Sequence, residues 1–185
     1  GDGDVAAWAG AEVQKGDPKT GELMLSTLCF IISNVDEGAF ANGPGLFAGD
    51  KNSPIYPILK SGRFPLIKGI HLCANLVGPG TVGFNAGHLW DIDNTNPESV
   101  SGAMVDGRLL AEEISRALME FHPKAFANSH LTVTANLLGA RESRRVIGDY
   151  VMTPQDYWAR RSFPDEIARN CYFMDSHTAV RDDAE

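Results

Sequence analysis

The sequence has few cysteines and no long apolar run. Its three cysteines, Cys29, Cys73 and Cys171, are far apart and form no CxxC pair, so neither a disulfide scaffold nor a zinc ribbon is expected. Reduced, unpaired thiols are typical of intracellular proteins, and we expect a cytoplasmic location. The longest apolar runs, such as residues 28–32, are too short to cross a bilayer as a helix.

The sequence also has fewer basic than acidic residues. Sixteen Lys and Arg against 24 Asp and Glu give a net charge of -8 and a pI near 5.1. Nucleic-acid binding depends on basic side chains that displace counterions from phosphates, so this balance argues against a nucleic-acid partner. A hydrophobic content of 43% is ordinary for a soluble globular protein, and 185 residues suffice for one domain.

Several signatures of catalytic and metal sites are missing from the sequence. No GxSxG elbow is present, which disfavours a serine hydrolase. The acidic stretches 1–4 and 91–93 lack the central glycine and final glutamate of a calcium loop. The histidines show no metal-ligand spacing, so no metal is expected.

Periodicity and turn residues predict an α+β fold, with a mostly antiparallel sheet and one long amphipathic helix. The clearest element is a helix over residues 96–121. Asn96 suits the N-cap, Pro97 suits the first helical position, and apolar residues recur at helical spacing until Pro123. Such a helix is expected to lie across one face of the sheet.

Shorter elements are predicted on both sides of this helix. Strands are expected over 23–35, 69–77, 81–91 and 129–138, with Gly78-Pro79-Gly80 as a hairpin turn. Short helices are expected over 5–11, 55–61 and 153–161, with another opening at Pro164. Residues 12–21 read as a loop or turn, and residues 39–69 as an irregular stretch rich in Pro and Gly.

The most informative segment is 139–150, where Arg141, Arg144 and Arg145 fall within five residues. Guanidinium groups hold planar anions through paired hydrogen bonds, so the cluster indicates a carboxylate, a phosphate or a reduced flavin ring. The structural alternative is that these arginines pair with Glu142 and Asp149 and fix the end of a strand.

Two strings of sequence carry a family resemblance. Gly-Ala-Arg-Glu-Ser-Arg-Arg-Val-Ile-Gly-Asp-Tyr-Val at 139–151, followed by Phe-Pro-Asp-Glu-Ile-Ala-Arg at 163–169, resembles the signature of a family of FAD-dependent oxidoreductases. The resemblance implies FAD as cofactor and hydride transfer between the flavin and a small organic substrate. The family's dinucleotide-binding GxGxxG turn does not occur in this sequence.

The resemblance also implies how the chain is organised. Gly-Asp-Gly-Asp-Val-Ala lies mid-chain in that family, so we expect a middle fragment, and the missing initial Met and charged 181–185 tail look like cuts. Residues 1–22 would be an FAD-proximal segment leading out of the dinucleotide-binding domain, and 23–185 the substrate or cap domain. Its partners would be a small-molecule substrate and the missing FAD-binding portion. We expect at least one exposed apolar face, and an isolated chain that binds FAD poorly and is inactive.

Under the resemblance, two arginines are the expected catalytic residues. Arg141 would stabilise negative charge on the flavin, and Arg144 would clamp an anionic substrate, while Arg145 ties the loop down. The residues expected to contact FAD are the opening turn and the first arginine: Gly1, Asp2, Gly3 and Arg141.

Each of these assignments has an alternative. The opening turn can simply lead into the first helix, with Asp2 or Asp4 as its cap. His88 is a candidate substrate-facing residue or a structural histidine. For the whole chain, the rivals are a cofactor-free small-anion-binding domain that uses Arg141 and Arg144, and a structural domain whose arginines are satisfied internally.

Overall fold

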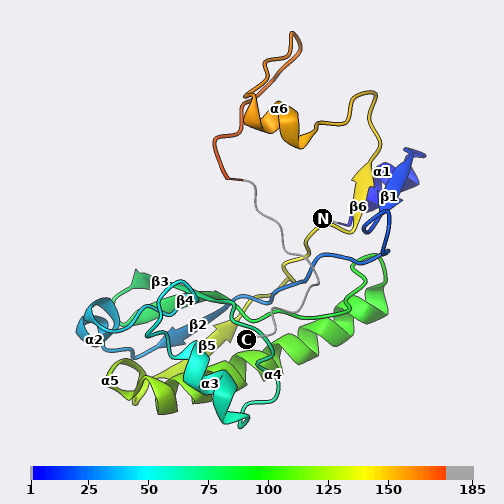
Figure 1. Cartoon of the computed structure of the whole chain (residues 1–185). Helices are drawn as coiled ribbons and strands as arrows, with labels where there is room; N and C mark the ends of the chain where they lie inside the picture. Colours follow the sequence, from blue (N-terminus) through cyan, green and yellow to red (C-terminus); the bar gives the residue numbers. More distant parts are fainter. Residues whose placement is uncertain (1, 174–185) are drawn as a thin grey trace.

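The computed structural model describes residues 2–173. Its main body has two layers, a four-stranded antiparallel sheet and a long helix packed on one face of it (Figure 1). The elements are α1 (Asp4–Trp8), β1 (Val13–Lys15), β2 (Phe30–Ser33), α2 (Glu37–Asn42), α3 (Ile55–Ser61), β3 (Leu72–Gly78), β4 (Thr81–Ala86), α4 (Pro97–Phe121), α5 (Pro123–Phe126), β5 (His130–Thr134), β6 (Arg144–Val146) and α6 (Pro154–Trp158). The elements α1, β1, β6 and α6 form an arm that extends away from the main body (Figure 1).

The sheet has the strand order β3-β4-β2-β5, and every neighbouring pair is antiparallel. The predicted hairpin is confirmed, with β3 and β4 joined at residues 79–80. Alternate side chains of each strand point to opposite faces. Phe30 and Phe84 lie on the helix side, where their rings stack 4.8 Å apart, and Ile31 and Gly83 lie on the other side.

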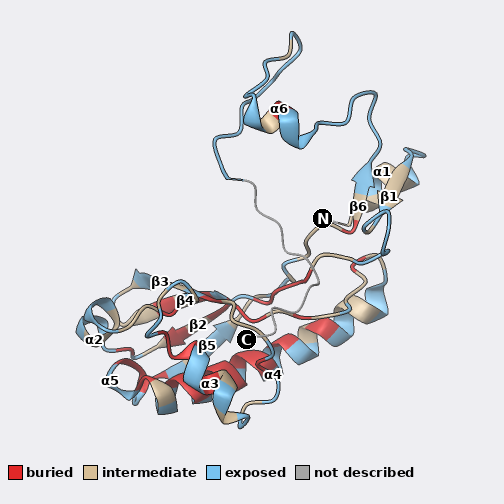
Figure 2. Ribbon diagram, viewed as in Figure 1, coloured by how far each residue is buried: buried red, intermediate tan, exposed pale blue. Residues whose placement is uncertain are grey.

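The predicted long helix is confirmed as α4. The Asn96 side chain accepts a hydrogen bond of 2.9 Å from the Glu98 amide, as expected of an N-cap. Its buried stripe, which includes Leu110, Ile114 and Leu118, packs on the sheet to form the core (Figure 2). The α+β prediction therefore holds, with the core between α4 and one face of the sheet.

Other predicted elements differ in length or are wrong. The strands β2 and β5 are shorter than predicted, and α3 has the predicted bounds. The helix expected at Pro164 is wrong, because that residue lies in a turn closed by the Glu166 amide on the Phe163 carbonyl. Four elements were not predicted from the sequence, and all are six residues or shorter: β1, β6, α2 and α5.

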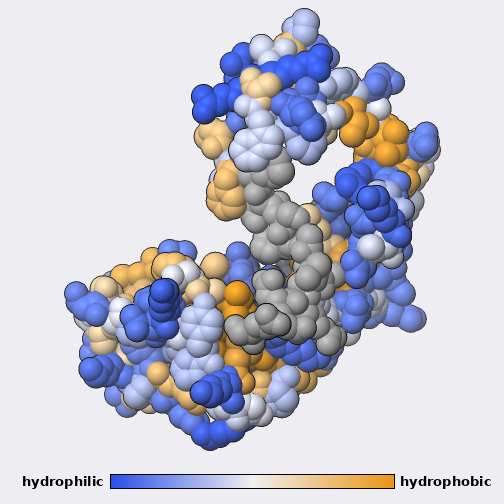
Figure 3. All heavy atoms as spheres, viewed as in Figure 1, coloured by the Kyte–Doolittle hydropathy of each residue, from blue (hydrophilic) through white to orange (hydrophobic). Residues whose placement is uncertain are grey.

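The sheet face opposite α4 is open. Val77 and Val133 are 60% and 47% exposed on it, and Ile31 is half-buried. The arm also carries apolar surface, including Trp8 and, between β6 and α6, the exposed Val151 (Figure 3). The expected exposed apolar face is therefore present in the described chain. Within residues 2–173, no helix is long and apolar enough to span a membrane.

Candidate functional site

The two segments singled out in the sequence meet in the arm. Strand β1 pairs antiparallel with β6, and Lys15 lies opposite Arg144 in the register. This pairing brings the Asp2–Gly3–Asp4 turn onto the arginine segment, although some 140 residues separate them. A Cβ atom added to Gly3 would lie 3.0 Å from the Cβ of Arg144, so the two backbones are closely apposed.

Arg144 is the centre of this junction. Its Nη1 donates to the Asp2 carbonyl at 3.2 Å and to the carboxylate of Asp4. The two side chains of the ion pair are 19% and 30% exposed, so solvent screens the pair incompletely. The charge of Arg144 is thus neutralised by Asp4, and this geometry does not favour the predicted role as an anion clamp.

The opening turn differs in part from expectation. Gly3 is the N-cap of α1 with φ of 68°, a left-handed conformation that suits glycine, and it has no side chain to cap the helix. Asp2 instead accepts a 3.2 Å hydrogen bond from the Asp4 amide. Gly1, a predicted FAD contact, lies outside the described residues.

Arg145 ties the loop down, as the sequence analysis predicted. Its Nη2 donates to the Gly16 carbonyl at 2.8 Å, and its Nε lies 3.3 Å from Glu142. Asp149 forms no ion pair with any described residue. The alternative that the arginines pair with nearby acids and fix the end of a strand therefore holds for Arg145, which pairs with Glu142.

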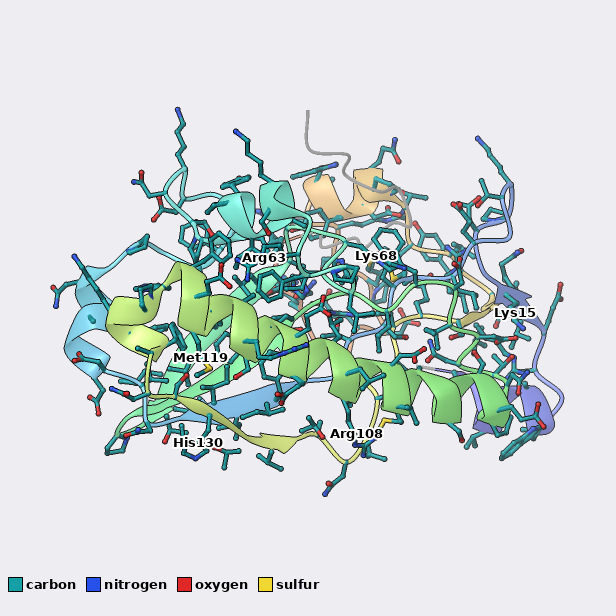
Figure 4. The ribbon with its side chains drawn as sticks, turned by 90° about the horizontal axis from the view of Figure 1, so that it is seen from below. Lys15, Arg63, Lys68, Arg108, Met119 and His130 are labelled. Atoms are coloured by element: carbon teal, nitrogen blue, oxygen red, sulfur yellow. The ribbon has the colours of Figure 1, made fainter. Side chains whose placement is uncertain are left out.

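Lys15 anchors the arm to the main body. It lies at the end of the molecule where α4 begins (Figure 4), with its Nζ 2.7 Å from Asp93 and 3.0 Å from the Thr95 hydroxyl. The hydrogen bonds from Lys15 and then Thr95 lower the pKa of Asp93 from 3.8 to about 2. Asp93 is therefore ionised at neutral pH and holds β1 against the start of α4.

Buried hydroxyl groups lie where the arm leaves the sheet. Thr27 pairs with Gly139 through two backbone hydrogen bonds of 2.8 and 3.3 Å. The Oγ atoms of Thr27 and Ser143 are buried, and neither has a hydrogen-bond partner among the described residues. A buried hydroxyl without a partner costs about 1–3 kcal/mol. Such groups are suited to a polar ligand atom.

Arg141 follows this junction directly. It comes two residues after Gly139, which is fixed on Thr27, and two residues before the buried Ser143. The Arg141 side chain is half-buried and its Nε atom is buried. Arg141 thus lies in the chain segment between the Thr27–Gly139 bridge and the buried Ser143.

His88 lies in an aromatic stack at the same end of the sheet. Its ring is parallel to that of His71, with centroids 4.3 Å apart, and meets Trp90 edge-on at 6.3 Å. The neighbouring Leu89 bridges to Ser26, next to Thr27. The half-buried His88 is therefore close in the fold to Thr27, and its ring packs as a structural histidine would.

A comparison with protein-family models gives one match. The model described as FAD dependent oxidoreductase matches residues 1–185, the full length of the chain. The chain belongs to the family of FAD-dependent oxidoreductases. Comparisons with curated proteins and with solved structures gave no match.

The second half of the family-like sequence is fixed to the first by a network that the sequence analysis missed. The carboxylate of Asp156 accepts from the Tyr150 hydroxyl at 2.6 Å and from Arg161 at 3.0 Å. Arg161 also lies over the rings of Tyr150 and Phe163, at 5.3 and 4.9 Å. The Tyr150 hydrogen bond is the largest of several that hold the pKa of Asp156 far below its usual range.

Asp156 is also part of the start of α6. With Thr153 it forms a capping box, in which the Thr153 hydroxyl and amide donate to the Asp156 carboxylate at 2.7 and 2.8 Å. The Thr-x-x-Asp spacing was the signal that could have identified this residue. Tyr150 thus helps to position the start of α6 through its hydrogen bond to Asp156.

The described residues fit part of an FAD molecule. The buried Thr27 and Ser143 hydroxyls and the half-buried Arg141 supply donors for a polar, electron-rich ring. The space beside Gly3 is taken by Arg144, so no side chain larger than glycine fits at that point of the turn. The adenine dinucleotide part of FAD is normally held by a GxGxxG turn between a strand and a helix, whereas the string of that spacing at residues 78–83 lies at the turn between the strands β3 and β4.

Proposed function

We propose that this chain is the substrate-side domain of an FAD-dependent oxidoreductase and that the flavin is carried by another part of the same protein. The observation that carries the proposal is the junction of the Asp2–Gly3–Asp4 turn with the arginine segment, which also contains the buried Ser143 hydroxyl. Residues 1–22 would lie next to the flavin, and 23–185 would form the substrate side. The family membership supports the cofactor.

The residues of the junction would have different roles in flavin binding and hydride transfer. FAD supplies the hydride acceptor or donor when it is bound. Arg141, held between the Thr27–Gly139 bridge and Ser143, would stabilise negative charge that develops on the ring. Thr27 and Ser143 would donate hydrogen bonds to the ring edge, and Asp2 and Gly3 would face the cofactor through their backbone. Arg144 would hold the turn in place through Asp4.

The test is substitution of Arg141 in the intact flavoprotein. Loss of a preorganised donor to developing charge typically slows an enzyme by about 10²–10³-fold. We expect Arg141→Ala to slow flavin reduction by a factor in that range and to lower the flavin reduction potential, and Arg141→Lys to recover part of both losses. Arg145→Ala is the matched control, because Arg145 bonds to Gly16 and Glu142. Equal effects of the Arg141 and Arg145 substitutions would refute the assignment.

A further inference from the structure

The open face of the sheet contains a hollow of about 490 Å³, on the side opposite α4. This volume lies within the range of about 300–1,000 Å³ that is typical of small-molecule sites. The hollow crosses β3, β4 and β2 and ends beside Asn136, after β5. None of the described residues that line it belongs to the junction of Arg144 and Asp4. Cys29, at one end of the hollow, is two residues from Thr27, and Asn136 is five residues from Arg141.

A glycine in the middle of a strand forms the floor of the hollow. Gly83 lies opposite Asn75 on β3 and opposite Ile31 on β2. Its φ is not in the left-handed region, so the backbone does not require glycine here. A Cβ atom would lie 3.0 Å from a methyl group of Val77 and would fill the floor. Because glycine weakens a strand interior, its presence at such a position often marks the close approach of a ligand.

The walls of the hollow combine apolar and neutral polar groups. None of the twelve described residues that line it carries a charged side chain. Ile31, Val77 and Val133 supply apolar surface, and polar contacts come mainly from carboxamides. A carboxamide both donates and accepts hydrogen bonds. An ionic ligand would enter without a counter-charge and lose its hydration, which is unfavourable.

We propose that this hollow binds a neutral small molecule with an apolar body and hydrogen-bonding groups, held by the carboxamides of Asn75, Asn85 and Asn136 over Gly83. The inference rests on the proposed function, since it makes this neutral compound the substrate of the oxidoreductase. It replaces the anionic substrate expected from the arginine cluster. The charged guanidinium of Arg144 is engaged by Asp4.

The thiol of Cys29 reports directly on occupation of the hollow. It is exposed and lines the hollow, whereas Cys171 is exposed on the distant arm. The probes are benzamide and its charged isostere benzoate, at matched millimolar concentrations. The rate of N-ethylmaleimide alkylation is measured at each cysteine by peptide mass spectrometry on the intact protein. We expect benzamide to slow alkylation of Cys29 at least about threefold, with Cys171 unchanged, and benzoate to leave Cys29 unchanged.

Two substitutions test the walls and the floor. Asn75→Ala combined with Asn85→Ala removes two exposed carboxamides and should abolish protection by benzamide, and Gly83→Val should do the same by filling the floor. Asn128→Ala, at an exposed asparagine outside the hollow, should retain the full protection. Circular dichroism establishes that each variant is folded.

Equal protection by benzoate, absence of protection by benzamide, or protection that survives the double asparagine variant would overturn the proposal. Cys29 protection is measured without flavin reduction. Failure here is therefore distinct from failure of the Arg141 test.

Discussion

The three arginines of the signature segment have different tasks. Arg144 binds the opening turn through Asp4, Arg145 binds the Gly16 carbonyl, and Arg141 lies by the Thr27–Gly139 bridge. The sequence correctly predicted that Arg145 ties the loop down, since its acidic neighbour Glu142 is three residues away. It did not predict the partner of Arg144, because that partner is 140 residues distant and becomes a neighbour through tertiary pairing.

Removal of Arg144 should loosen the arm. The Arg144–Asp4 pair is partly shielded from solvent, so we expect Arg144→Ala to lower the local stability of the β1–β6 ribbon by about 1–2 kcal/mol. Hydrogen exchange of the Ile147 amide, which donates to the Glu12 carbonyl at 2.9 Å, measures this stability. Arg145→Ala should change it less, since the Arg145–Glu142 pair is about half exposed. Unchanged exchange in Arg144→Ala would show that the pair does not hold the ribbon.

The Tyr150–Asp156 hydrogen bond predicts a coupled titration. The Asp156 carboxylate raises the pKa of Tyr150 above 10.0, because the bond favours the protonated phenol. We expect Asp156→Asn to lower the titration midpoint of the Tyr150 phenol toward its ordinary value. The titration is measured by ¹³C NMR of the ring. Glu166→Gln removes another carboxylate of the same segment and should leave the midpoint in place. Identical midpoints in wild type and Asp156→Asn would contradict the bond.

The same network predicts how the start of α6 responds to acid. The pKa of Asp156 is lowered from 3.8, so its ionised form is the one that the folded arm stabilises. This stabilisation is fully present above pH 4 and is lost as the pH falls through the lowered value. The Asp156 amide donates to the Thr153 hydroxyl. The protection of this amide from hydrogen exchange should therefore not change with protonation of the Asp156 carboxylate near neutral pH. Loss of protection of that amide between pH 7 and 5 would disagree with this assignment.

At the level of elements, local signals predicted the helices better than the strands. The N-cap Asn96, the proline after it and the apolar stripe are all contained within α4, and they gave its bounds. The limits of a strand depend on its pairing partners. Strand β4 ends at Ala86, where the backbone turns at Gly87 with a φ of 72°. The ribbon of β1 and β6 has three residues in each strand, and no local pattern marks segments that pair only through tertiary contacts.

Two glycines of α4 provide a matched test of its packing. A methyl group on Gly107 would lie 2.7 Å from the Cβ of Leu28, so Gly107→Ala should force the helix off the sheet. Overpacking costs about 1–3 kcal/mol and the gain in helix propensity is about 1 kcal/mol, so we expect a net loss of up to about 2 kcal/mol. At Gly102 no atom lies within 4 Å, and Gly102→Ala should stabilise by about 0.5–1 kcal/mol. Urea denaturation measures both, and equal effects would contradict the close approach at Gly107.

In the whole molecule, only one of the two faces of the sheet is covered by a helix of the described residues. The helix α4 buries one face of the sheet, while the other face and the arm leave large side chains such as Val77 and Trp8 exposed. Periodicity predicted the α+β class, and the family resemblance predicted an exposed apolar face. They could not place the hollow over Gly83, because its residues come from three parts of the chain that meet through strand pairing.

The central claim is that this chain supplies the substrate side of a flavoprotein and that another part of the protein holds the cofactor. An FAD titration on two proteins tests it most directly: the 185-residue chain, and the same chain joined to the flavin-binding part that the proposal requires. We predict that the longer protein retains flavin absorbance at one FAD per chain and that the 185 residues alone do not. Stoichiometric binding of FAD by the 185 residues alone, or no binding by either protein, would contradict the claim.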